Sequence, residues 1–524
     1  MRVFSGLRSG VFVFCAIILL ALSGCSESQS PITNVYAAYS LLAPSNTGGT
    51  ILYARVIVDG VEVRCPELIG NDDTEITMSV RGYHPDNNTA SENFPVTTCE
   101  AIISPGVSYA VTYALAPSTI TIDAVTLNPS SVIVYGDTGC KSSDCKDGKA
   151  AKPFDVLAQG GVDIDADLIL HMGDYNYRGT SGSIRKKPKK IYAYDAGDGG
   201  FDGAACGFVG SDYYSQNASG SPKPGRWKYW RDDFFKPAKE LLPKAPWVFS
   251  RGNHELCSRA GKGWFYFLGP GSSLDGGVPQ LTCPDQGELE FPPQGAKDHI
   301  VMIPSYTLAL DPLKLWVVDS ANACDASAAN SLTAQYSTQF EKLYEQEGKD
   351  KAGNGQADSK PVWMVTHRPL WGGAVKKIKK SSLLSASAES SIVPFNIMMQ
   401  KALSNTPAAR LPESVKLILS GHKHLFQSVS FLESKTDRPP QIIIGNSGVS
   451  LNKSPEGIYK TVIDGEESSL HQFSKYGFLH ITLNSDDSWY GDILNKSGRS
   501  IVHCNSKNSS LHQSICKIDG LKSK

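Results

Sequence analysis

Five short apolar runs in this sequence each end in a polar cluster that contains aspartate, asparagine or histidine. In chain order the clusters read GDTG, GDYNY, RGNHE, THRP and GHKH. The candidate ligands in them are Asp137, Asp174, Tyr177, Asn253, His367, His422 and His424, with His254 beside them. First-row metal ions bind carboxylate and amide oxygens and imidazole nitrogens. Two such ions about 3.5–4 Å apart can clamp a phosphoryl group and lower the pKa of a bound water. The residue types therefore predict a centre that holds two metal ions.

The apolar runs predict the elements that would bring these clusters together. The runs that precede the clusters are VIVY, LILHM, WVFS, VWMV and KLILS, and LWVVDSA and QIIIGNSG are of the same kind. Continuous apolar runs of this length are typical of strands covered on both faces, as in α/β folds. Apolar spacing predicts a helix over residues 332–348. Because ligands of α/β folds gather at the carboxyl ends of strands, we expect the clusters to converge.

The ordered set GD…GD-x-x-Y…GNHE…H…GHKH resembles the calcineurin-like metallophosphoesterases, and within them the purple acid phosphatases. The motifs extend from Asp137 to His424, and their order and local spacing make the resemblance specific. It implies an α/β/β/α sandwich for the metallophosphoesterase domain. It also implies two metal ions as cofactors, Fe(III) together with a divalent Fe, Zn or Mn.

The resemblance also assigns a role to each matching residue. The ferric ion would be bound by Asp137, Asp174, Tyr177 and His424. The divalent ion would be bound by Asp174 as the bridge, Asn253, His367 and His422. His254 would be the catalytic residue, outside the metal shell and near the leaving-group oxygen.

Several of these residues also have purely structural interpretations. Tyr177 could pack its ring under the loop with its hydroxyl hydrogen-bonded. Asp137 could cap a helix, and Asp174 could brace a turn. Glu255 is expected to orient His254 or to cap the following helix rather than to bind metal.

The sequence departs from the family pattern in the fourth motif. Met364 stands three residues before the histidine, where the family often has valine, and both side chains suit a buried strand. The family's further substrate-contacting histidines have no counterpart in THRPLWGGAVKKIKK. Arg368 in this segment could contact phosphate or could pair with a carboxylate.

We hypothesise that the protein is a metal-dependent phosphoric ester hydrolase that resembles acid phosphatases and acts on phosphate monoesters. A metal-bound hydroxide would attack phosphorus in line, and protonated His254 would assist departure of the alcohol. A phosphodiesterase and a nucleotide or pyrophosphate hydrolase on the same centre are alternatives. A non-catalytic surface binding lipoprotein is an alternative from another class. Degenerate sites normally lose ligands, however, whereas every expected metal ligand has a candidate here.

The charge balance bears on the partners of the protein. The formal net charge is −1, and removal of residues 1–24 lowers Lys+Arg from 51 to 49 against 52 Asp+Glu, which makes it −3. This balance argues against a nucleic-acid partner. The resemblance to the phosphoesterases implies a phosphorylated small molecule as the substrate. The basic runs RKKPKK and KKIKK are interpreted as solvated loops.

The N-terminus has the pattern of an export signal. Two arginines and an apolar run over residues 11–22 precede LSGC. The apolar run is too short to remain as a membrane span. The segment resembles a bacterial lipoprotein signal, which implies lipidation of Cys25 and, with Ser26 following, anchoring to the outer membrane. The protein would then be periplasmic or exposed on the cell surface. An ordinary cleaved signal that happens to contain a cysteine is the alternative.

The cysteines predict disulfides. Twelve are present, and ten remain when Cys15 and Cys25 are set aside, an even number in an exported chain. Sequence proximity favours the pairs Cys65–Cys99, Cys140–Cys145, Cys257–Cys283 and Cys504–Cys516, which leaves Cys206 for Cys324, although sequence does not determine connectivity.

The length of the chain favours more than one domain. We predict a signal at residues 1–24, a flexible tether at 25–47, an N-terminal β-sandwich-like domain at 48–129, a catalytic domain at 130–490 and a C-terminal tail with a disulfide at 491–524. Within the N-terminal domain, Asp59-Gly60 is expected to form a two-residue hairpin turn. The long Gly, Ser and Lys-rich segment at 179–224 is expected to be an irregular insertion.

Overall fold

The computed structural model describes most of the chain. The described residues are 32, 34–61, 63–85, 93–113, 120–140, 152–177, 226–257, 260–275, 277–283, 301–325, 330–354, 360–376, 391–431, 438–506 and 515–518. The predicted signal, the lipidation site Cys25, the basic run at 185–190 and the insertion at 179–224 lie outside these residues.

The larger sheet contains strands from both ends of the chain. Its strands are β1 (Val35–Pro44), β2 (Thr50–Asp59), β5 (Ser79–Val80), β6 (Val96–Ile102), β9 (Ser131–Tyr135), β10 (Leu168–His171), β11 (Trp247–Phe249), β22 (Gly477–Leu483), β23 (Trp489–Asn495), β24 (Ser500–Asn505) and β25 (Cys516–Ile518). Within the described residues their order is β25-β24-β23-β22-β9-β10-β11-β1-β2-β6-β5. Strands β9, β10 and β11 are parallel, so their carboxyl ends lie at one edge.

A second sheet carries the later clusters. Its strands are β12 (Tyr306–Ala309), β13 (Lys314–Val318), β14 (Val362–Thr366), β17 (Val415–Ser420), β18 (Phe426–Phe431), β19 (Gln441–Ile444), β20 (Gly457–Ile463) and β21 (Glu466–Phe473). In the described part of the chain they are ordered β12-β13-β14-β17-β19-β18-β21-β20. Strands β13, β14, β17 and β19 are parallel. All seven apolar runs that we interpreted as strands therefore form strands.

Two smaller sheets complete the described strands. One contains β3 (Glu67–Gly70), β4 (Glu75–Thr77), β7 (Tyr109–Thr112) and β8 (Ile120–Ile122), in the order β4-β3-β7-β8. The other pairs β15 (Gly373–Lys376) with β16 (Ser391–Pro394).

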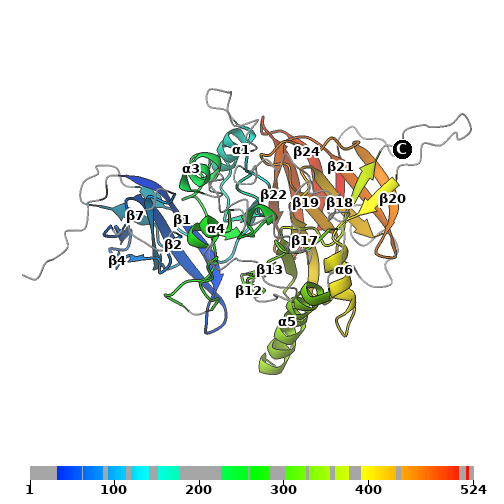
Figure 1. Ribbon diagram of the computed structural model, residues 1–524, viewed down its shortest axis with the longest axis horizontal. Helices are drawn as coiled ribbons and strands as arrows, with labels where there is room; N and C mark the ends of the chain where they lie inside the picture. The colour runs from blue at the N-terminus through cyan, green and yellow to red at the C-terminus, as the bar shows by residue number, and fades with distance from the viewer. Residues whose placement is uncertain are drawn as a thin grey trace, which may run out of the picture.

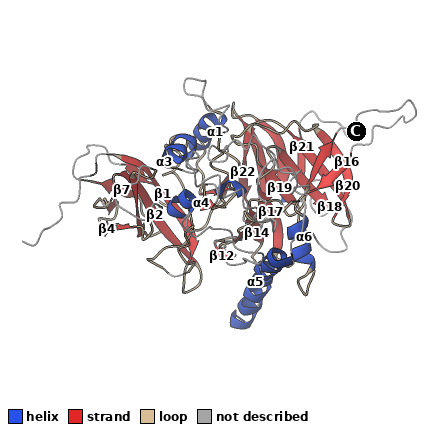
Figure 2. Ribbon diagram, viewed as in Figure 1, coloured by secondary structure: helices blue, strands red, loops and turns tan. Residues whose placement is uncertain are grey.

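Helices cover the outer faces of the two large sheets (Figure 2). The helical elements of the described residues are α1 (Pro153–Val162), α3 (Trp227–Trp230), the π-helical η2 (Arg231–Phe235), the 3-10 turn η3 (Asn253–Glu255), α4 (Gly261–Phe267), α5 (Asn330–Asn354) and α6 (Ile397–Ser404). The helix predicted at 332–348 is confirmed as the core of α5. In the described residues, no helix is both long enough and apolar enough to cross a membrane.

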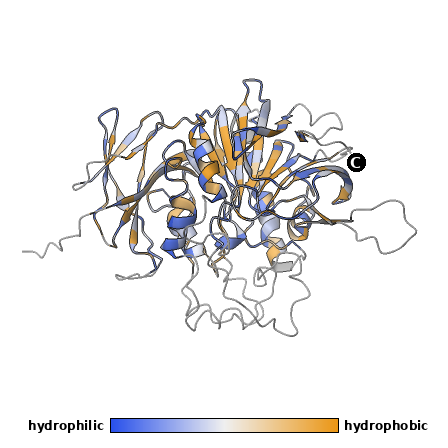
Figure 3. Cartoon of the chain, turned by 90° about the horizontal axis from the view of Figure 1, so that it is seen from above, coloured by the Kyte–Doolittle hydropathy of each residue, from blue (hydrophilic) through white to orange (hydrophobic). Residues whose placement is uncertain are grey.

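The two large sheets pack face to face, and their strands are rich in apolar residues, which are orange in Figure 3. The inward-facing side chains of one core cluster come from both sheets and include Val134, Leu170, Val365 and Leu419. The outer face of the larger sheet, with Ile133 and Tyr135, packs against α1, and that of the second sheet, with Met364 and Ile418, packs against α5 and α6. The layers are thus helix, sheet, sheet and helix, and the predicted α/β/β/α fold is confirmed.

The N-terminal region is β-rich, but it is continuous with the larger sheet (Figure 1). Strand β1 pairs in parallel with β11 and antiparallel with β2. The prediction of a flexible tether to residue 47 is therefore wrong at Val35–Pro44, which form a buried strand. The hairpin at Asp59-Gly60 is also wrong, because β2 ends there and takes β1 and β6 as its neighbours.

Buried charges connect this region to helix α4. Glu100 on β6 forms ion pairs with Arg55 and Arg81, and all three side chains are buried. Arg55 donates to the carbonyl oxygen of Phe267 at 2.7 Å, and Arg81 donates to that of Gly271 at 2.6 Å. Cations at the end of a helix satisfy its last carbonyls and favour its dipole. The N-terminal strands therefore hold the segment that follows the GNHE cluster.

The described C-terminal residues, 491–506 and 515–518, are not a separate tail. β24 and β25 extend the larger sheet, because their side chains join its core, which includes Val502 and Cys516. The predicted disulfides Cys65–Cys99, Cys257–Cys283 and Cys504–Cys516 are confirmed. Cys140 and Cys324 are also disulfide-bonded, and the partners predicted for them, Cys145 and Cys206, lie outside the described residues.

Candidate metal centre

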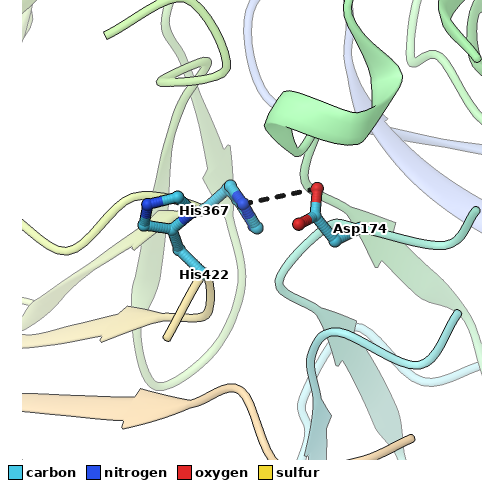
Figure 4. A group of neighbouring side chains, drawn as sticks. All are labelled: Asp174, His367 and His422. Atoms are coloured by element: carbon cyan, nitrogen blue, oxygen red, sulfur yellow. Dashed lines mark ion pairs between the residues drawn. The ribbon is translucent and has the colours of Figure 1, made fainter. Parts of the chain in front are cut away.

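The two sheets bring all five polar clusters to one place. Asp137 follows β9, and Asp174 and Tyr177 follow β10. Asn253 and His254 begin η3, just after β11. From the second sheet, His367 follows β14, and His422 and His424 follow β17. Side chains from the two sheets meet there, and Figure 4 shows His367 pointing toward Asp174 with His422 beside it.

Tyr177 lies at the centre of one half of the site. Its hydroxyl oxygen is 2.8 Å from Oδ1 of Asp137, 3.1 Å from Oδ2 of Asp174 and 3.1 Å from Nε2 of His424. Nε2 of His424 is 3.6 Å from Oδ1 of Asp137. A phenol has one proton and can donate it to only one of these atoms. The four side chains predicted for the ferric ion are therefore gathered around one point.

The other half of the site surrounds the side-chain oxygen of Asn253. Oδ1 of Asn253 is 3.0 Å from Nε2 of His367 and 2.8 Å from Nδ1 of His422. Nε2 of His367 is also 3.4 Å from Oδ1 of Asp174. Ligand atoms of Asp174, His367 and His422 all lie within 4.8 Å of one another. Asp174 thus contributes one oxygen to each half of the site.

The side chains of the site fit a cation, because imidazole nitrogens and carboxylate or amide oxygens face one another with their lone pairs. Nδ1 of His367 lies 2.6 Å from the carbonyl oxygen of Met172, which can only accept, so Nδ1 carries a proton. Nε2 then presents its lone pair to the oxygens of Asn253 and Asp174. Nδ1 of His424 is held in the same way by the carbonyl oxygen of Ser450, at 3.1 Å. Only a proton or a metal ion between these atoms makes such contacts favourable.

The titration of the site without metal reflects the same crowding. Burial and the neighbouring Asp174 raise the pKa of Asp137 to about 7. Burial opposes ionisation of Asp174 too, but His367 and His254 hold the pKa of Asp174 well below its usual value. Burial lowers the pKa of His367, yet Asp174 outweighs it and raises that pKa to about 9. Burial and both carboxylates also raise the pKa of Tyr177 well above 10.0. The metal-free site therefore retains protons where cations would otherwise neutralise the charge.

A family model for the calcineurin-like phosphoesterases matches residues 130–426 of this chain. The chain belongs to the calcineurin-like phosphoesterase family. Among solved structures it is similar to a purple acid phosphatase from the seeds of yellow lupin (Lupinus luteus), with 12% sequence identity and a TM-score of 0.45, over 93% of this chain and 74% of that chain. No curated protein matches the chain. The family supports a metal-dependent phosphoester hydrolase.

The backbone of this phosphoesterase is strained at the metal centre. Asp137, Asp174 and His422 have positive φ values of 57°, 61° and 73°. Residues other than glycine rarely adopt positive φ values, and such backbone strain is concentrated at functional sites. A Cβ atom at Gly421 would lie 2.6 Å from Oδ2 of Asp137, and one at Gly252 would overlap the carboxylate of Asp174. The glycines of GNHE and GHKH are therefore required by close packing.

Glu255 holds the loop that carries Asp174. Its carboxylate accepts hydrogen bonds from the backbone N–H groups of Asp174, Tyr175, Asn176 and Gly252, at 2.9 to 3.2 Å. It caps η3, the short turn to which it belongs, through Gly252, and it also orders the loop after β10. This contact differs from both predicted roles, which were to orient His254 or to cap the following helix. The bonds of Glu255 go to backbone groups, which gives it a structural role in the phosphoesterase.

Five charged residues form ion pairs beside the ligands, and only Arg368 among them was considered from sequence. Arg251 bonds to Asp319 at 2.8 Å and joins the ends of β11 and β13 across the two sheets. Arg368 pairs with Asp325 at 3.0 Å, which agrees with the carboxylate interpretation, and Lys423 pairs with the same residue at 2.6 Å. Asp319 directly follows the run LWVV and could have been found as another strand end. Asp325 lies in a loop six residues further on and carries no such signal.

Removal of metal should make the stability of this phosphoesterase depend on pH between 7 and 9. His367 binds its proton more tightly in the folded state, where its pKa is about 9, than in the unfolded chain, near 6.5. Its contribution to stability is complete below pH 6.5 and is lost as pH rises through 9, at about 1.4 kcal/mol per pH unit. Thermal midpoints measured at pH 7, 8 and 9 should fall in EDTA. With zinc bound, the midpoints should change little with pH, because the cation replaces the proton on His367. Equal slopes of thermal midpoint against pH in EDTA and in zinc would contradict this interpretation.

Proposed function

We propose that this protein is a dinuclear-metal phosphatase that resembles purple acid phosphatases and hydrolyses phosphate monoesters. The observation that carries the proposal is the position of Asp174, whose two oxygens contact the two halves of the site. The substrate would be a phosphorylated small molecule. Two cations that share a carboxylate suit a substrate group with several charged oxygens.

The two halves of the site suit different ions. Asp137, Tyr177 and His424 would hold one ion together with Asp174, and a phenolate is a hard anionic donor that favours Fe(III). Asn253, His367 and His422 would complete the other half, where neutral donors suit a divalent Fe, Zn or Mn. When bound, the pair would neutralise the phosphoryl oxygens and lower the pKa of a water that attacks phosphorus.

His254 is proposed as the proton donor to the leaving alcohol. Its ring lies against that of Tyr177, with the centroids 4.0 Å apart, and its backbone N–H donates to Oδ1 of Asp174 at 2.8 Å. The residue is thereby fixed beside the ligands, and its side chain is half-buried. A positioned imidazole can protonate the ester oxygen as the bond to phosphorus breaks.

The proposal is tested with protein that lacks residues 1–24, loaded with iron and zinc. Metal analysis should give two ions per chain, and a phosphate monoester should be hydrolysed faster than a diester or ATP assayed beside it. A diester or ATP as the best substrate would replace the monoester proposal. A chain that binds no metal, or binds two ions without hydrolysing any phosphoester, would overturn the enzymatic one.

Replacement of Tyr177 by phenylalanine should remove visible colour from the iron-loaded protein. Phenylalanine keeps the ring that packs on His254 but lacks the oxygen that contacts Asp137, Asp174 and His424. Strong visible absorption in the wild-type protein and its loss in the variant, at equal iron content, would assign the band to a phenolate ligand. An unchanged spectrum would reduce Tyr177 to a packing residue.

We also propose that the protein is exported and anchored to the outer membrane through a lipid on Cys25. The proposal rests on the LSGC pattern, and the three disulfides Cys65–Cys99, Cys257–Cys283 and Cys504–Cys516 support an oxidising compartment. Mass spectrometry of the N-terminal peptide should find acyl chains on Cys25. An unmodified cysteine, or cleavage elsewhere, would leave an ordinary export signal.

A further inference from the structure

Each imidazole of the metal centre is held from its far side by a hydrogen-bond acceptor. For His367 and His424 the acceptor is a backbone carbonyl oxygen, of Met172 and Ser450 respectively. Such partners fix which ring nitrogen carries the proton and turn the other nitrogen toward the metal. Backbone acceptors cannot be removed by substitution of a side chain.

His422 is held differently, by the side chain of Asp325. Nε2 of His422 is 3.0 Å from Oδ2 of Asp325, and its Nδ1 faces Oδ1 of Asn253 at 2.8 Å. Asp325 comes from the loop after β13, and its side chain is only 9% exposed. The ring therefore lies between a buried carboxylate on one side and the metal ligands on the other.

Arg368 also approaches the same ring nitrogen, and the two contacts must be distinguished. Nη1 of Arg368 is 3.1 Å from Nε2 of His422 and 3.0 Å from Oδ1 of Asp325. Arginine can only donate, and a carboxylate accepts, so a proton on Nε2 can be shared only with Asp325. The hydrogen bond of Arg368 then goes to Oδ1 of Asp325, and its closeness to His422 follows from the shared partner. This arrangement leaves the lone pair on Nδ1, on the side of Asn253.

Asp325 is itself fixed in place. Nζ of Lys423 lies 2.6 Å from Oδ2, and Arg368 binds Oδ1, so both oxygens have cationic donors. Lys423 stands between the two candidate ligands His422 and His424 in the sequence, and its Nζ lies over the ring of Phe395, 4.3 Å from the centroid. The carboxylate therefore has little freedom to turn away from His422.

We propose that Asp325 is the positioning residue that orients His422 toward the divalent ion, with Arg368 and Lys423 holding Asp325. This inference rests on the proposed dinuclear function. It assigns to a side chain, for one ligand, the task that backbone carbonyls perform for His367 and His424. It also assigns to Arg368 and Lys423 the role of holding Asp325 in place, rather than of binding the substrate.

The test compares zinc binding by the wild-type protein and by Asp325→Ala and Asp325→Asn, measured by equilibrium dialysis. Loss of such a partner typically weakens metal binding about 10–100-fold. We expect Asp325→Ala to weaken zinc binding by this factor at the half of the site around Asn253, His367 and His422. The half around Asp137, Tyr177 and His424 should keep its ion. Asp325→Asn keeps an acceptor for Nε2 of His422 and should lose less affinity. The control is Asp233→Asn, which also removes a buried carboxylate paired with a lysine, Lys152 at 3.2 Å, but lies on η2 outside the centre.

Several outcomes would overturn the inference. One is two ions bound to Asp325→Ala with wild-type affinity, and another is an equal loss in the alanine and asparagine variants, which would mean that charge rather than the hydrogen bond to His422 matters. An equal loss in Asp233→Asn would mean that any buried carboxylate has the same effect. Failure of the proposed function is separate, because it would be seen in the wild-type protein as absent metal or absent hydrolysis.

Discussion

Replacement of Asp174 by asparagine is expected to weaken the binding of both metal ions and to slow phosphomonoester hydrolysis by at least about 10³-fold. Oδ2 of Asp174 lies 3.1 Å from the hydroxyl oxygen of Tyr177, and Oδ1 lies 3.4 Å from Nε2 of His367. An amide has one neutral oxygen and cannot serve both halves of the site. Metal stabilisation of the transition state is worth several kcal/mol, so its loss has an effect of this size.

The fold should survive this substitution, which makes the result interpretable. The asparagine oxygen can still accept the hydrogen bond that the backbone N–H of His254 gives to Oδ1 at 2.8 Å. Removal of one of two buried carboxylates also relieves the repulsion that raises the pKa of Asp137. The ion pair of Asp174 with His367 is lost as well, so the metal-free variant should unfold at a lower temperature than metal-free wild type at pH 7. Two tightly bound ions and activity within tenfold of wild type in Asp174→Asn would remove the bridging role.

Most candidate metal residues could be found from sequence because they lie within a few residues of the end of a strand. Tyr177 lies further from β10 and was found through the family motif. Burial on both faces makes such strands visible as uninterrupted apolar runs, and the first polar residue after each run marks its carboxyl end. Parallel strands place these ends at one edge, as β9, β10 and β11 do for Asp137, Asp174 and Asn253. Asp325 escaped this reasoning because it reaches His422 from within a loop, at a distance from its strand that no pattern fixes.

The sequence was a poorer guide to which strands pair. An apolar pattern reports that a strand is buried but not which strand lies beside it. The run at Val35–Pro44 is buried next to β11, although the surrounding Ser, Pro and Asn residues favoured a tether. The hairpin expected at Asp59-Gly60 rested on a local turn signal, whereas β2 takes its neighbours from β1 and β6. The same long-range pairing brings Arg55 and Arg81 to the end of α4, a contact that no local motif predicts.

Replacement of His254 by alanine should reduce turnover about 10²–10⁴-fold on a substrate with a poor leaving group, while both metal ions stay bound. The contact of His254 with Asp174 is through its backbone N–H, which alanine also has. Its side chain packs on Tyr177 and does not contribute to the group of ligand atoms formed by Asp174, His367 and His422. A matched control is His503→Ala, since His503 is an exposed histidine on β24 that pairs with Asp492 at 2.5 Å.

The dependence on the leaving group separates proton donation from any structural role of His254. An alkoxide is a strong base and needs a proton as it departs, whereas 4-nitrophenolate is stable without one. The loss in His254→Ala should therefore be large for an alkyl phosphate and small for 4-nitrophenyl phosphate, at equal metal content. If the ring acted only by packing against Tyr177, its removal would slow both substrates by the same factor. An equal loss on the two substrates would accordingly remove His254 from the proton transfer, even if the variant were slow.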